Sequence, residues 1–131
     1  MQEIAKNEYY ELAYDSARNW IHWTMRGFWP SMNDVPDFAS DWAKAVEATK
    51  AGWKIYANLS ELKVMPDDVK NAQDEQQRVL MEKGCQRVCC LIDSAVTKLS
   101  LNTVLKNSGM SSIVQYFTAD EAEDGKTWLA A

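Results

Sequence analysis

The sequence predicts one α/β domain built on a mixed β-sheet. From residue 33 onward, segments with the apolar periodicity of helices alternate with strand-like segments, an order typical of a largely parallel sheet with right-handed crossovers. The run RVCCLI over 87–92 is almost continuously apolar, as expected of a strand buried on both faces. Residues 8–28 precede this alternation and predict a β-hairpin, which adds an antiparallel edge. The expected element order is therefore ββαβαβαβα.

The hairpin over 8–28 consists of two strands joined by the polar loop 15–19. Apolar residues recur at every second position, so each strand has one apolar face. The residues on these faces are Tyr10, Leu12 and Tyr14 in the first strand and Ile21, Trp23 and Met25 in the second.

The middle of the chain predicts helix, strand and helix. The first helix is expected over 33–50 and is followed by a strand over 53–59, which is rich in β-forming residues. A second helix is expected over 66–83, where Pro66 suits the first helical position and two aspartates follow it. Its inner stripe contains polar members beside the apolar ones: Val69, Ala72, Gln76, Val79, Leu80 and Lys83.

The remainder predicts strand, helix, strand and helix. The buried strand over 87–92 is followed by a helix over 94–108, which Ser94 can cap. A short strand is expected over 112–117. The four residues TADE then form a capping box that opens a final helix ending near residue 129.

Length and composition narrow the classes of protein. A chain of 131 residues has the length of one domain, expected over 1–131, and its 47% hydrophobic residues are enough for a packed core. The net charge of −5, with basic residues scattered, argues against nucleic-acid binding. No leader pattern or apolar run of about 18 residues is present, so no transmembrane segment is expected. The odd number of cysteines, Cys85, Cys89 and Cys90, favours a reduced, cytoplasmic location.

Three segments in this order carry a family resemblance. They are HWTMRGFW over 22–29, IYANLSEL over 55–62 and FTADEAEDGKTWL over 117–129. The chain resembles, over about 8–129, the SpoIIAA-like family of small bacterial STAS-related domains, which are also likened to the lipid-binding Sec14 fold. The resemblance implies a compact sheet with helices packed on it. It implies no single activity, because fold does not determine function.

The best-known relatives are anti-sigma-factor antagonists, in which a phosphorylatable serine opens a helix in a pattern like I-D-S-S-G. The matching stretch here is VMPDDV over 64–69, and the position of the serine is occupied by Asp67 or Asp68. A kinase-controlled switch is therefore not expected at this position. An aspartate carries about one negative charge against roughly −1.5 to −2 for phosphoserine, so it imitates the modified state only in part. Alternatively, both carboxylates simply suit a helix N-terminus.

No residue pattern predicts a catalytic, cofactor-binding or metal site. His22 is the sole histidine, and no carboxylate, nucleophile or metal ligand is placed beside it by spacing. The cysteines lack the C-x-x-C spacing of zinc and redox motifs. Asp93 and Ser94 follow a central strand, but no glycine-rich phosphate-binding loop is present, and Ser94 is interpreted as a helix cap.

Our first hypothesis is a non-enzymatic regulatory or protein-interaction module with an unidentified protein partner. An exposed aromatic patch on the hairpin or near 60–70 would support it. The aromatic face of Trp20 and Trp29 also suggests a homodimer patch. The candidate interaction residues are Trp20, His22, Trp29, Ser60, Asp67 and Asp68.

The alternative is a domain that binds a small apolar ligand or a lipid. The Sec14 likeness and the six tryptophans motivate this alternative. It requires an interior pocket lined by Trp, Leu and Met, and a fully packed core would exclude it. A third hypothesis, an enzyme, requires a cleft that gathers His22, Asp67 or Asp93 within hydrogen-bond reach.

Overall fold

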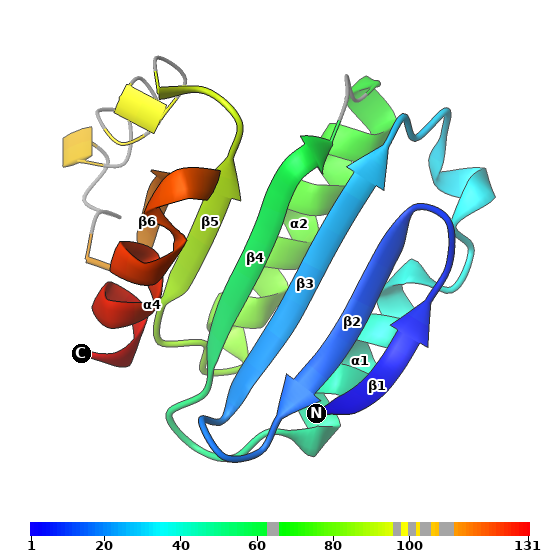
Figure 1. The fold of residues 1–131 in the computed structure, drawn as a ribbon. Coiled ribbons are helices and arrows are strands. Elements are labelled where there is room, and N and C mark those ends of the chain that lie inside the picture. Colours follow the sequence, from blue (N-terminus) through cyan, green and yellow to red (C-terminus); the bar gives the residue numbers. More distant parts are fainter. Residues whose placement is uncertain (63–65, 96–97, 100–101, 103–105, 108–111) are drawn as a thin grey trace.

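The computed structural model describes residues 1–62, 66–95, 98–99, 102, 106–107 and 112–131 (Figure 1). These residues form a mixed six-stranded sheet and three α-helices. The strands are β1 (Gln2–Lys6), β2 (Tyr10–Asp15), β3 (Trp20–Gly27), β4 (Lys54–Leu62), β5 (Val88–Ile92) and β6 (Val114–Thr118). The α-helices are α1 (Phe38–Ala48), α2 (Asp67–Glu82) and α4 (Ala122–Ala130), and two short 3-10 helices are η1 (Met32–Asp34) and η2 (Ala119–Glu121).

The strands lie side by side in the order β1-β2-β3-β4-β5-β6. The pairs β1–β2 and β2–β3 are antiparallel, whereas β3, β4, β5 and β6 run parallel. Helices α1 and α2, which follow β3 and β4, cover one face of the sheet, and α4 covers β5 and β6 on the other face (Figure 1). Right-handed crossovers that advance in one direction across a sheet place their helices on one face, as seen here for α1 and α2. The expected α/β class with an antiparallel edge is confirmed.

The predicted order omitted the strand β1. Its sequence QEIAK is mostly exposed and has little of the apolar alternation that marks a half-buried strand. The strand exists because it pairs with β2, with a register shift between Glu3 and Ala5. The expected order ββαβαβαβα therefore lacks one antiparallel strand at its start.

Helix boundaries also differ from the prediction. The helix expected over 33–50 begins only at Phe38, because η1 and the Pro36 turn precede it. A residue before proline is disfavoured in helical geometry, and Val35 is accordingly non-helical. The TADE capping box is confirmed at Thr118, but it opens η2 before α4 begins. The helix expected over 94–108 falls mainly outside the described residues.

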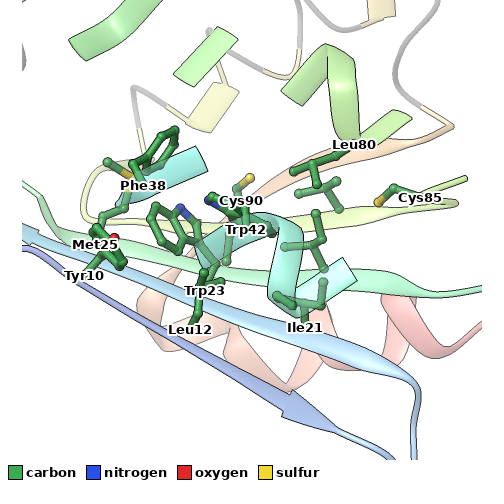
Figure 2. Packing of buried hydrophobic residues seen from close by; sticks show 14 of the residues in the cluster. Tyr10, Leu12, Ile21, Trp23, Met25, Phe38, Trp42, Leu80, Cys85 and Cys90 are labelled. Atoms are coloured by element: carbon green, nitrogen blue, oxygen red, sulfur yellow. The ribbon is translucent and has the colours of Figure 1, made fainter. Parts of the chain in front are cut away.

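The main core lies between the sheet and the α1/α2 layer and is rich in aromatic side chains (Figure 2). Trp23 is at its centre, with ring centroids 5.1 Å from Tyr10, 5.0 Å from Trp42 and 5.9 Å from Phe38. The buried Tyr10 hydroxyl donates a hydrogen bond of 2.5 Å to Asp41 of α1. Aromatic packing and this buried bond together join the hairpin to α1.

A second, smaller core lies on the other face of the sheet beneath α4. Its buried members are Trp20, Cys89, Leu91 and Leu129. Gly125 lets α4 approach β5 closely, since a Cβ at this position would lie 2.7 Å from Cys89 Sγ and 3.3 Å from the Phe117 ring. All five residues of β5 are buried, which confirms the prediction for this strand.

We expect Tyr10→Phe to lower the free energy of unfolding by about 1–3 kcal/mol, because Asp41 loses the donor that satisfies a buried carboxylate oxygen. Chemical denaturation of both proteins measures the difference. The control is Tyr9→Phe, since the Tyr9 side chain lies at the edge of the same aromatic cluster. Equal stability of Tyr10→Phe and the wild type would contradict this role of the bond.

We expect Gly125→Ala to lower the free energy of unfolding by about 1–3 kcal/mol, because the added methyl group collides with Cys89 Sγ. The double variant Gly125→Ala/Cys89→Ala makes room for that methyl group. A double-mutant cycle by chemical denaturation should therefore show favourable coupling of about 1 kcal/mol. Strictly additive effects would show that α4 moves away from the sheet instead.

Candidate functional site

A pocket of about 170 Å³ lies between the sheet and α2, beside α1. Four strands form its floor, α2 covers it, and α1 contributes Trp42. The side chains from the sheet are Trp23, Met25, Ile55, Ala57, Leu59, Leu62, Val88, Cys90 and Tyr116. Those from α2 are Gln73, Asp74, Gln76, Gln77, Leu80 and Met81.

The floor is hollow because two small residues stand between two large ones. Trp23 is in register with Ala57, Ala57 with Cys90, and Cys90 with Tyr116. Residues in register across a sheet point to the same face, so these four form one row beneath α2. The two aromatic side chains project at the ends of the row, while the methyl and thiol groups leave the middle open.

The helix above this floor does not fill the space. Gln73, Gln77 and Leu80 follow one another at spacings of four and three residues, which places them on one face of α2. They line the pocket, and of the sixteen residues of α2 only Val69 and Leu80 are buried. Glutamine amides therefore stand where a packed core would have apolar side chains.

Two buried N–H donors among the pocket residues lack a partner. Trp42 Nε1 and Gln73 Nε2 are inaccessible to solvent and make no hydrogen bond within the described part of the chain. Other indoles are satisfied, since Trp29 Nε1 donates to Tyr9 O at 3.2 Å and Trp53 Nε1 to Lys83 O at 3.4 Å. Unpaired buried donors are uncommon and each costs about 1–3 kcal/mol. Both donors belong to residues that line the same pocket, which marks this pocket as the candidate site.

The charges at the pocket are sparse and of one sign. Among the lining residues that the structure describes, Asp74 is the only ionisable side chain with a formal charge, and no Lys, Arg or His contributes. Burial raises the pKa of the Cys90 thiol to about 12 and also raises the pKa of Tyr116. Both groups therefore stay neutral near pH 7, so the pocket offers apolar surface and hydrogen bonds.

The tryptophans proposed for an interaction surface are buried within the chain. Trp20 is 4% exposed and lies beneath α4, whereas Trp29 is fully buried in the main core. This corrects the expectation that they share an exposed aromatic face for a homodimer. Among the described large apolar residues of this region, Phe28 is exposed, at 53%. A protein-interaction role stays a prediction.

The remaining predicted interaction residues lie apart from the pocket. His22 lies on the sheet face opposite α2, with its ring centroid 6.3 Å from Trp20, and burial lowers its pKa. Ser60 donates to Asn58 Oδ1 at 2.6 Å in β4. Asp68 accepts from the Met32 N–H at 3.1 Å and so ties the start of α2 to η1.

Asp67 is exposed at the first position of α2, as a helix N-terminus favours. Neither Asp67 nor Asp68 lines the pocket, and the same holds for His22 and Asp93, the other residues considered for catalysis. In the part of the chain that the structure describes, no group of three or more His, Cys, Asp or Glu side chains is placed to hold a metal ion.

Sequence reasoning missed the pocket, although two of its residues carried a signal. Gln76 and Leu80 belong to the predicted inner stripe of α2, and Gln76 is a polar residue on a face that should be apolar. A polar residue on an inward-facing stripe is informative in this way, because burying a polar group without a partner is costly. Gln73 and the unpaired Trp42 donor become visible only in the fold.

We expect all three thiols to react slowly in the native protein. Cys85, Cys89 and Cys90 are buried, and burial raises the pKa of each to about 12, so little of the reactive thiolate is present at pH 8. Iodoacetamide labelling followed by mass spectrometry should proceed only as fast as the protein opens. The denatured protein serves as the control with full reactivity. Rapid native labelling of one cysteine would show that it is accessible.

Comparisons with family models, curated proteins and solved structures find no match for this chain. The resemblance to SpoIIAA-like domains therefore stays a prediction. None of the helices in the described ranges has the length and apolar character needed to span a membrane. The pocket beneath α2 is the candidate functional site.

Proposed function

We propose that this protein binds a small, mainly apolar molecule in the pocket between the sheet and α2. The observation that carries this proposal is the pocket of about 170 Å³ itself, which opens partly to solvent between the main core and α2. Its lining consists mainly of aromatic and aliphatic side chains, with a few polar groups among them. Small-molecule sites typically use this combination of residue types. Trp23, Trp42, Leu59, Leu80 and Met81 are among the apolar side chains of the lining.

The apolar lining of the pocket supports an occupant. The pocket opens partly to solvent and is lined mainly by apolar side chains. An occupant that covers this surface removes it from water, which contributes about 25 cal/mol per Å² of apolar surface.

The volume also limits the size of the occupant. An engineered cavity of about 150 Å³ in another protein takes up benzene, whereas pockets for drug-sized ligands span about 300–1,000 Å³. A pocket of about 170 Å³ therefore suits one ring or a short chain. This size favours a compact molecule over a whole lipid.

Filling the pocket tests the proposal. Ala57→Leu places a larger side chain in the middle of the floor, between Trp23 and Cys90. The matched control is Ala13→Leu, because Ala13 pairs with His22 and alternates with Leu12, and so it lies on the opposite face of the sheet. The probe is toluene, and the readout is the shift in melting temperature.

We expect toluene to stabilise the wild type and Ala13→Leu by about 1.4 kcal/mol at ten times its Kd, which is a shift of a few degrees. Ala57→Leu should show almost no shift, because the added side chain takes the space of the ring. An equal shift in all three proteins would place the binding elsewhere. No shift in the wild type would contradict an apolar binding site of this size.

A further inference from the structure

We propose that the molecule bound in this pocket carries an uncharged hydrogen-bond acceptor, as in a ketone, ester or amide. This inference rests on the proposed function and specifies the chemical class of the ligand. It follows from two properties of the described lining residues: two of them carry unpaired N–H donors, and none of them is positively charged.

Two residues that line the pocket carry hydrogen-bond donors that the protein itself leaves unused. Trp42 Nε1 and Gln73 Nε2 are both buried donors without a partner among the described residues, and both residues line the pocket. They come from different helices, α1 and α2, which cover the same face of the sheet. An occupant without an acceptor would leave both donors unsatisfied, whereas a carbonyl oxygen can accept from an N–H donor.

The pocket lacks a positive charge. No Lys, Arg or His is found among its described lining residues, and Asp74 adds negative charge at its α2 side. A buried carboxylate or phosphate without a cation is strongly disfavoured, and a nearby carboxylate adds repulsion. The acceptor is therefore a neutral oxygen, which separates this ligand class from fatty acids and phosphorylated molecules.

Two probes of nearly the same shape distinguish the acceptor from simple apolar filling. Cyclohexanone and methylenecyclohexane differ by C=O against C=CH₂ and have seven heavy atoms each. The variant Gln73→Met removes the amide donor and keeps a side chain of similar length. Trp42→Phe removes the indole N–H and keeps an aromatic ring at this position.

Dissociation constants for both probes are measured by NMR titration of the wild type and the two variants. We expect each variant to weaken cyclohexanone about three- to tenfold, the loss of one hydrogen bond, and to change methylenecyclohexane less than twofold. In the wild type, the indole N–H resonance that disappears in Trp42→Phe should move downfield with cyclohexanone and should stay nearly unshifted with methylenecyclohexane.

Other outcomes overturn the inference at different points. Equal losses for both probes in the variants would show a packing effect and reject the acceptor, while the apolar site would stand. Cyclohexanecarboxylate that binds as tightly as cyclohexanone would reject the uncharged class. If neither neutral probe binds the wild type and toluene also fails, both the inference and the proposed function are rejected.

Discussion

Trp23 packs where the hairpin, α1 and the floor of the pocket meet. This indole contacts Tyr10, Phe38 and Trp42, and its ring centroid lies 6.4 Å from that of Trp29. The cluster fixes α1 against the hairpin and determines how far the helical layer stands from the sheet. Because Trp23 also forms one end of the row beneath α2, the same contacts that hold the fold together shape the pocket.

Much of the fold could be predicted because its information is local. The alternation in the hairpin, the continuous apolar run of β5 and the capping box at Thr118 each specify an element within a few residues. The strand β1 escaped prediction because its pairing with β2, and not its own apolar pattern, makes it a strand. The start of α1 was misplaced because Pro36 lies within a turn that the apolar periodicity does not detect.

The candidate site could be predicted only in outline. The Sec14 likeness and the six tryptophans motivated an apolar-ligand hypothesis, and the polar members of the inner stripe of α2 were also visible in the sequence. The hollow over Ala57 and Cys90 depends on the register of separate strands, which no single segment encodes. The unpaired Trp42 donor is likewise a property of the packed core, because an indole N–H finds or lacks a partner only there.

The sheet divides the protein into two cores of very different size. Among the described residues, the core beneath α4 has four buried members, whereas the core on the α1/α2 face has twenty. Contacts at the C-terminal end of α4 come from Lys54 Nζ to Leu129 O at 2.5 Å and from Arg87 to Trp128 O at 2.6 Å. Opening of a small cooperative unit needs less free energy than global unfolding. Helix α4 rests on fewer described buried side chains than α1 and α2, so slow amide exchange should persist longest in the strands around Trp23.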